Sequence, residues 1–273
     1  MSILCTKNPS TEMDVRMVPV PQTTRTYVPM PHGDLIDTIE VQLAHHLPQY
    51  YVADKQYGLA REGQQLFGLM TLKKKIYPHP ADITMAEGIG EEYINPPRAE
   101  DDIDLSIGFR NSYDKSMSVG IVGGAKVFIC DNMMMSSDAV KFMKRHTKNV
   151  LKEFDYMLWT NLPELQCQFV QMKEAKAKLE HVGVEHQEGY EFLGRMYGNG
   201  LLTPVQFTSA VADWKAPSFE VFKPRNAWSL YNAVTWGLKR GSPSLVINRY
   251  TKANDWMMSS ILGGEIIDVE ALN

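Results

Sequence analysis

The sequence predicts an α+β fold in which a small antiparallel sheet packs against helices. Residues 50–74 have the pattern of a β-hairpin, and residues 103–130 add further short strands. Apolar residues then recur every three or four positions in most of the segments between 138 and 240, which is typical of helices. Strands grouped before helices favour α+β over an alternating α/β fold.

The first helix is expected at 33–46, where Leu35, Ile39 and Leu43 recur at helical spacing. Pro48 would end it. Two strands follow at 50–60 and 64–74, and Arg61-Glu62-Gly63 supplies the short loop of a hairpin. The second strand is apolar on both faces, as expected of a central strand.

Three more strands are expected at 103–111, 116–123 and 126–130, with a tight turn at Gly123-Gly124. A helix pattern then covers 138–182, and Asn161 with Pro163 predicts an end and a restart within it. Shorter helices are expected at 186–197, 203–214 and 226–240.

These elements suggest one α+β domain at 32–240. Residues 1–31 would form an extended arm with a short strand near 16–20, and residues 241–273 a C-terminal extension. The acidic, proline-containing segment 76–102 is expected to be a long surface loop or, alternatively, a lid.

Composition limits the classes of function. The chain has 273 residues, 44% of them hydrophobic, which suffices for a sizeable core. Because the net charge is −4, nucleic acid could bind only at a local basic surface. Three widely spaced cysteines argue against a disulfide framework, and no apolar run is long enough to span a membrane. We therefore expect a cytoplasmic protein, with no metal site and no cofactor.

The polar segment between the strands at 103–111 and 116–123 is the first candidate site. Arg110, Asn111, Ser112 and Lys115 offer hydrogen-bond donors and positive charge that suit a phosphate. The alternative is an ordinary polar turn in which Asp114 pairs with Arg110 or Lys115. Asn132 follows the next strand and could point into the same site or cap a helix.

A basic stripe is the second candidate. On the expected helix, the cationic residues recur at spacings of three, four and seven and would mostly share one face; they are Lys141, Lys144, Arg145, Lys148 and Lys152. Such a face could follow a phosphate backbone or simply be solvated. Bases would also need stacking partners, for which Phe109, Tyr113 and Phe142 are candidates or else core residues.

Evidence for catalysis is weaker. No P-loop, HExxH or dinucleotide-binding glycine pattern is present. Cys130 is expected to be a buried, inert thiol, with His146 as the one candidate base near it. An enzyme acting on a phosphorylated or nucleotide-like ligand would need polar side chains that converge in one pocket. The candidates for lining such a pocket are Arg110, Asn111, Asp114, Asp131, Asn132 and His146.

Several motifs carry a family resemblance. GFRNSYDKSMSVGIVGGAKVFICDN, KFMKRHT and NAWSLYNAVTWGL resemble the domain-of-unknown-function family 932 (DUF932) of phage and plasmid proteins. PHGDLIDTIE and YGLAREGQQLFGLMTL extend the resemblance over about residues 29–240. It implies an origin in a mobile element. The order of elements is also similar to that of phage single-strand annealing proteins of the RecT and Red-beta group, which implies a basic groove on an oligomer.

The leading hypothesis is a phage-encoded protein that binds single-stranded nucleic acid as a homo-oligomer, with strand annealing in recombination or replication as its role. Phosphates would contact Arg110, Lys115, Lys144, Arg145 and Lys148, while Asn111, Ser112 and Asn132 orient the strand. The alternatives are the enzyme described above and an anti-defence or host-takeover protein that binds a host protein and whose acidic segment could mimic the charge of nucleic acid.

Overall fold

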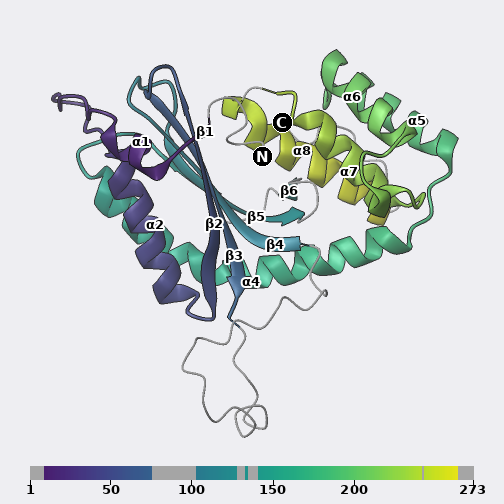
Figure 1. Cartoon of the computed structure of the whole chain (residues 1–273), viewed down its shortest axis with the longest axis horizontal. Helices are drawn as coiled ribbons and strands as arrows, with labels where there is room; N and C mark the ends of the chain where they lie inside the picture. Colours follow the sequence, from purple (N-terminus) through teal and green to yellow (C-terminus); the bar gives the residue numbers. More distant parts are fainter. Residues whose placement is uncertain (1–8, 76–102, 128–132, 135–140, 242, 264–273) are drawn as a thin grey trace, which may run out of the picture.

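The computed structural model describes residues 9–75, 103–127, 133–134, 141–241 and 243–263. The fold is α+β, as predicted, with an open antiparallel sheet and helices packed on it (Figure 1). Within these residues the strand order is β1-β2-β3-β4-β5-β6, and β7 also pairs with β5.

The predicted hairpin is confirmed. β2 (Tyr50–Ala60) and β3 (Gln65–Lys74) pair in antiparallel fashion from Tyr50↔Lys74 to Ala60↔Gln65. Arg61, Glu62 and Gly63 in the connection all have positive φ, a conformation that only glycine adopts without strain. β3 is a central strand between β2 and β4, which explains why its residues 65–72 are all buried.

The predicted turn at Gly123-Gly124 is wrong. β4 (Ile103–Ser112) pairs with one continuous strand, β5 (Val119–Val127), and the two glycines lie opposite Ile107 and Ser106 in the middle of it. Every residue of β5 is buried. Glycine pairs favour tight turns, but they are also tolerated in a strand where backbone pairs on both sides fix the conformation.

The helix expected from residue 138 begins later. Lys141–Lys144 form strand β7, which pairs with β5 from Val119↔Lys144 to Val122↔Lys141. The cationic residues from Lys141 to Lys152 therefore do not share one helix face. The open edge of β5 supplies backbone partners that outweigh helix propensity over this short segment. A second short strand, β6 (Met133–Met134), pairs with Ala125 and Lys126 of β5.

The N-terminal segment also differs from the expected arm. β1 (Pro9–Ser10) pairs with the outer edge of β2, and helix α1 (Glu12–Met17) stands where a strand near 16–20 was predicted. A capping box explains α1, because Thr11 accepts a hydrogen bond from the backbone N–H of Asp14 and Asp14 accepts one from that of Thr11. The predicted first helix is confirmed as α2 (His32–His46).

The break predicted at Asn161–Pro163 is absent, because α4 (Val150–His181) is continuous through it. Buried side chains recur along the whole length of this helix, on one stripe: Val150, Phe154, Leu158, Leu162, Leu165, Phe169, Met172 and Leu179. An internal proline costs about 3 kcal/mol, and burying this stripe outweighs it.

The remaining predicted helices are confirmed as α5 (His186–Gly198), α6 (Pro204–Lys215) and α7 (Ala227–Leu238), with a short 3₁₀ turn, η1 (Glu220–Phe222), between the last two. Thr203 caps α6 by accepting from the Gln206 N–H, and Asn226 caps α7 by accepting from the Ser229 N–H. α7 is buried nearly all round rather than on one face.

Residues 243–262 are part of the folded domain rather than an extension. They form α8 (Pro243–Leu262), in which Tyr250, Trp256 and Met257 are at most 1% exposed. The Tyr231 hydroxyl of α7 donates to the Asn254 Oδ1 at 3.0 Å, and the Tyr250 hydroxyl donates to the Thr235 carbonyl at 2.8 Å. These bonds fasten α8 to α7.

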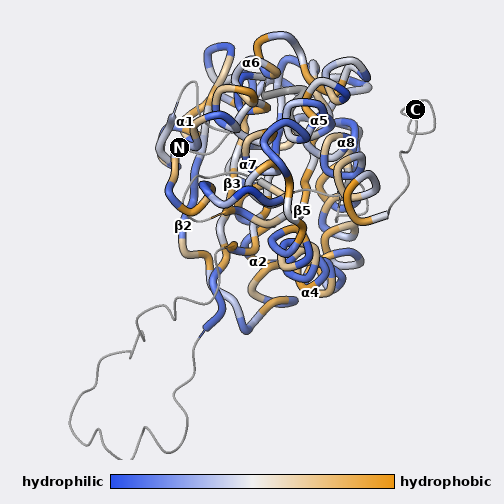
Figure 2. The backbone as a smooth tube through the Cα atoms, turned by 90° about the vertical axis from the view of Figure 1, so that its right-hand side faces the viewer, coloured by the Kyte–Doolittle hydropathy of each residue, from blue (hydrophilic) through white to orange (hydrophobic). Residues whose placement is uncertain are grey.

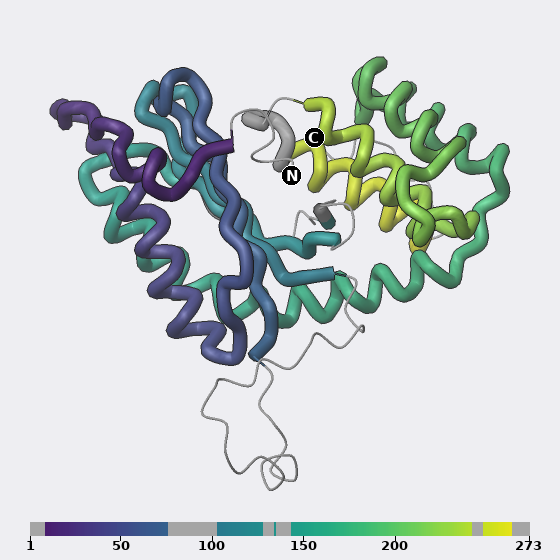
Figure 3. Tube along the Cα trace, viewed as in Figure 1, coloured from purple at the N-terminus to yellow at the C-terminus, as the bar shows by residue number. Residues whose placement is uncertain are grey.

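Helices cover both sides of the sheet. α2 and the first half of α4 pack on one face, while α7 and α8 stand across the other side (Figure 1). α4 runs along the bottom of the molecule from the sheet to α7 (Figure 3), and in the end-on view of Figure 2 it lies below α8. Among the described helices, none combines the length and the apolar character needed to cross a bilayer.

Candidate nucleic-acid interface

The two predicted polar segments meet at one end of the sheet. Gln65, at the start of β3, lies opposite Ser112, at the end of β4, and Val119 of β5 lies opposite Lys144 of β7. This arrangement brings the turn after Ser112 close to the residues that follow Lys144. Five buried polar or aromatic residues fill this end, and we refer to them as the sheet-end cluster: Tyr27, His32, Asn111, Tyr113 and His146.

Asn111 is a structural residue of this cluster. Its side chain is fully buried, and its amide donates to the Met30 carbonyl at 2.7 Å and to His32 Nδ1 at 2.9 Å. Its oxygen accepts the Ser112 backbone N–H at 3.0 Å. Because these bonds use both ends of the amide, Asn111 is not placed to contact a ligand.

Ser112 is likewise buried, and its hydroxyl donates to the Met117 carbonyl at 2.8 Å. Asp114 pairs with Arg61 at 2.9 Å and accepts from Gln65 Nε2 at 3.0 Å, so the predicted partners Arg110 and Lys115 are replaced by residues of the β2–β3 hairpin. Burial by itself would raise the pKa of the Asp114 carboxyl, but hydrogen bonds from the Ser116 hydroxyl and backbone N–H, together with those from Arg61 and Gln65, lower it.

His32 is held as a neutral ring. Its Nδ1 accepts from Asn111, so its Nε2 is the donor to the Gly63 carbonyl at 3.1 Å. Its ring stacks on Tyr113 at 3.9 Å between centroids, and the Tyr113 hydroxyl accepts the His32 backbone N–H. Burial, with a smaller contribution from His146, lowers the pKa of His32 to about 4.

His146 and Tyr27 close the cluster toward solvent. The two rings lie 5.5 Å apart, and the Val28 N–H donates to the His146 carbonyl. His146 is 7% exposed, and neither ring nitrogen has a hydrogen-bond partner among the described residues. Burial lowers its pKa below the usual value. The Tyr27 hydroxyl donates to the Tyr113 carbonyl at 3.1 Å.

Two of the predicted phosphate ligands are engaged within the protein. Arg110 is 9% exposed, donates to Met143 Sδ at 3.1 Å, and has a guanidinium pKa that burial lowers. Lys144 forms an ion pair with Glu153 at 2.7 Å. The structure therefore gives both residues internal contacts.

The remaining cations surround the cluster on the surface. Lys115, Arg145 and Lys148 are exposed, and in the part of the chain that the structure describes none forms an ion pair. Lys115 Nζ lies 4.6 Å from the centre of the Tyr27 ring. Arg145 precedes His146, and Lys148 lies in the turn before α4. Arg25, exposed on a turn closed by Thr24 and Tyr27, joins them.

We call Arg25, Lys115, Arg145 and Lys148 the cationic rim. The sequence did not reveal Arg25, because the fold alone brings residue 25 beside residues that lie 90 or more positions away. Phe109 and Tyr113, two of the candidate stacking residues, are at most 4% exposed and cannot reach a base. Cys130, Asp131, Asn132 and the segment 76–102 lie outside the described residues, as does the side chain of Phe142.

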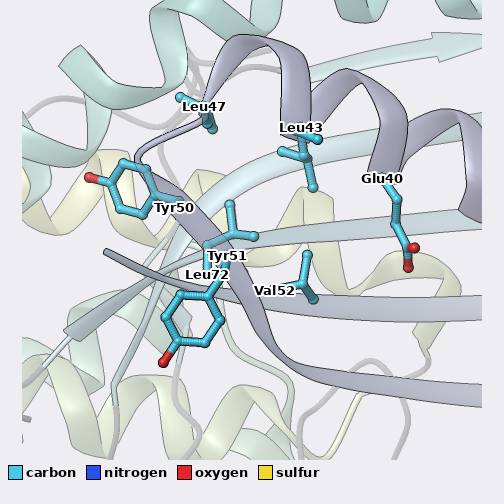
Figure 4. Close-up of a pocket in the computed structure, with 8 residues that line it drawn as sticks. Glu40, Leu43, Leu47, Tyr50, Tyr51, Val52 and Leu72 are labelled. Atoms are coloured by element: carbon cyan, nitrogen blue, oxygen red, sulfur yellow. The ribbon is translucent and has the colours of Figure 1, made fainter. Parts of the chain in front are cut away.

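A small pocket lies elsewhere, between α2 and the start of β2 (Figure 4). Its volume is about 80 Å³, and apart from Glu40 its lining is mostly apolar or aromatic, including Leu43, Leu47 and Tyr50. Glu40 is paired with Lys55 at 2.5 Å. Pockets that bury small ligands are usually several times larger, so this one is too small for a nucleotide.

No protein-family profile, curated protein or solved structure matches this chain. The resemblance to the DUF932 family and the likeness to annealing proteins therefore remain expectations based on the motifs and the element order.

Proposed function

We propose that this protein binds single-stranded nucleic acid through the cationic rim. The observation that carries the proposal is that Lys115, Arg145 and Lys148 are exposed at one end of the sheet and make no ion pair with any residue that the structure describes, in a protein whose net charge is −4. An acidic protein that concentrates unpaired cations on one surface favours a negatively charged partner there.

The buried cluster beneath the rim supports this role. His32, Asn111 and Tyr113 tie α2, β4 and the segment around Met30 together, so the backbone that carries Lys115 is rigidly supported. Positioning cations in advance reduces the entropy lost when a phosphate chain binds. Strand annealing in recombination or replication is the process suggested by the likeness of the element order to that of phage annealing proteins.

The enzyme alternative has less support. Asn111 and Ser112 use their polar groups inside the protein, and Arg110 is engaged with Met143. These residues therefore do not converge on a ligand pocket, as catalysis on a phosphorylated ligand would require. No observation on the described residues favours the host-protein alternative.

A binding titration at several salt concentrations tests the proposal. Log affinity for a single-stranded oligonucleotide should fall linearly with log salt, with a slope of about −0.7 for each phosphate contact. Arg145→Glu with Lys148→Glu should weaken binding and make the slope shallower by about 0.7 for each lost contact.

Lys74→Glu with Lys75→Glu is the matched control. These two lysines are also exposed, but they lie at the opposite end of β3 from Gln65, about 30 Å away at ~3.3 Å per residue. The control changes net charge equally and should leave most of the affinity intact. Equal losses in both variants, or no binding at low salt, would rule out the proposed interface.

A further inference from the structure

We propose that Tyr156 and Trp159, on the outer face of α4, form a stacking platform for the bases of the strand whose phosphates the cationic rim binds. The inference rests on the proposed function and adds the surface that would contact the bases. Neither aromatic residue was singled out from the sequence, and both lie off the apolar stripe of the helix.

The two side chains are exposed although both are large and apolar. Tyr156 is 68% exposed and Trp159 50%, while Phe154 and Leu158 on the opposite side of the helix are fully buried. Contiguous exposed apolar patches mark binding surfaces, whereas apolar residues scattered singly over a surface do not. The fold leaves this face of α4 uncovered and packs the other against the sheet.

Helical spacing places the platform next to the cations. Lys152, Tyr156 and Trp159 follow at intervals of four and three residues, so they share one face. At ~1.5 Å per residue, Lys152 and Trp159 are about 10 Å apart along the axis, close to three nucleotide steps of ~3.4 Å. Lys148 of the rim lies in the turn that leads into α4, four residues before Lys152, so the rim lies at the end of the helix from which the platform starts.

The Trp159 indole is fixed in place from one side. The His45 ring stacks on it at 4.5 Å between centroids with an interplanar angle of 25°, and the His46 ring meets it edge-on at 4.7 Å. Both histidines belong to the last turn of α2. An indole held by two imidazoles, with half of its surface open, loses little freedom when a base stacks on it.

Charge complementarity favours nucleic acid over a protein partner as the occupant. Lys148 and Lys152 make no ion pair within the described residues, whereas of the two neighbouring acids Glu153 is neutralised by a lysine and Asp155 keeps its charge, which leaves an excess of positive charge. Asp155 accepts from Gln42 Nε2 at 2.7 Å, and Glu153 pairs with Lys144. The surface therefore offers free positive charge beside open aromatic rings, the combination that single strands use.

The test compares two probes on the full chain, a 15-nucleotide thymidine strand and an abasic phosphodiester of the same length. The wild type should bind the thymidine strand at least about fivefold more tightly, because each stacked base contributes affinity that phosphates cannot. Tyr156→Ala with Trp159→Ala should remove this preference and leave the affinity for the abasic chain unchanged. Trp159→Phe should retain most of the preference for the thymidine strand, because phenylalanine still offers an aromatic ring.

Val170→Ser is the matched control, since Val170 is 48% exposed on α4 about three turns beyond Trp159. This substitution should leave the affinities for the thymidine strand and for the abasic chain unchanged. Equal binding of the two probes by the wild type, with the charge-reversal variant still weakened, would overturn the platform and leave the proposed function standing. Sedimentation of the double alanine variant tests another occupant of this face. If the variant no longer self-associates but binds the thymidine strand with unchanged affinity, the face belongs to a second copy of the chain and the inference is overturned. Absence of binding to both probes at low salt would refute the proposed function itself.

Discussion

Asn111 illustrates how a residue with the chemistry of a ligand contact serves the interior instead. Its side chain makes three hydrogen bonds, to Met30, His32 and Ser112, and no part of it reaches solvent. The same network keeps His32 uncharged, because a proton on Nδ1 would face the Asn111 amide hydrogens. Burial therefore couples the protonation of one imidazole to the integrity of this end of the sheet.

The low pKa of His32 predicts acid sensitivity. The folded protein keeps this ring neutral down to pH about 4, whereas the unfolded chain takes up a proton near pH 6.5, so stability is lost as the pH falls between these values. At ~1.4 kcal/mol per pH unit, the free energy of unfolding should drop by about 2 kcal/mol from pH 7 to pH 5 from this residue alone. Urea unfolding at pH 7 and at pH 5 measures this drop in the free energy of unfolding.

NMR titration of the histidine rings provides the check on that assignment. The His32 ring should remain neutral at pH 5.5. A His32 titration midpoint near 6.5 would contradict the prediction.

At the scale of elements, α5 shows how a glycine can be required in one turn of a helix and be dispensable in the next. A Cβ on Gly189 would lie 2.2 Å from the Trp214 indole, which packs against the helix there. A Cβ on Gly194 would meet nothing within 4 Å. The Trp214 Nε1 donates to the His186 carbonyl at 3.1 Å, so the indole is not free to move away.

Substituting these two glycines should therefore have opposite effects. Gly189→Ala should destabilise the protein by about 1–3 kcal/mol, because the methyl group overlaps the indole. Gly194→Ala should stabilise it by about 0.5–1 kcal/mol, because alanine favours the helix and no contact opposes it. Thermal unfolding of both variants measures the two effects, and a shift in the same direction for both would refute the packing argument.

Elements whose own residues determine them were predictable, and elements that depend on distant partners were not. The β2–β3 hairpin, α2, α5, α6 and α7 follow local periodicity, turns and caps. By contrast, β7 exists because β5 offers an open edge, and α4 continues past Pro163 because its buried stripe runs the full length. Part of the candidate site could be predicted from the sequence, because Lys115, Arg145 and Lys148 are exposed. The position of Arg25 near them and the burial of Asn111 could not, because both depend on tertiary contacts.

For the whole molecule, one apolar core joins the sheet to all the longer helices, including α8 near the C-terminus. Trp256 of α8 has no exposed surface, and the centre of its ring system lies 4.9 Å from the centre of the Phe192 ring of α5. α4 contacts the sheet with its first half and α7 with its second. The sheet and the helical half should therefore unfold together.

Trp256→Ala tests this single-unit behaviour. The loss of a fully buried indole should lower the free energy of unfolding by about 3–5 kcal/mol, and circular dichroism and tryptophan fluorescence should report the same lowered midpoint. Trp159→Ala, at a half-exposed position, should cost less than about 1 kcal/mol. Two separate transitions in the Trp256 variant would show that the halves fold independently.

The borders of the sheet limit how copies of this protein can join. At one border the pairing strand is only Pro9–Ser10, and proline cannot donate a backbone hydrogen bond to a further strand. At the other, β5 is already engaged by the short segments β6 and β7. β1 pairs with only Tyr57 and Gly58 of β2, so it shields little of that strand of 11 residues, and the outer edge of β2 is the border at which we expect a strand from a second copy to add.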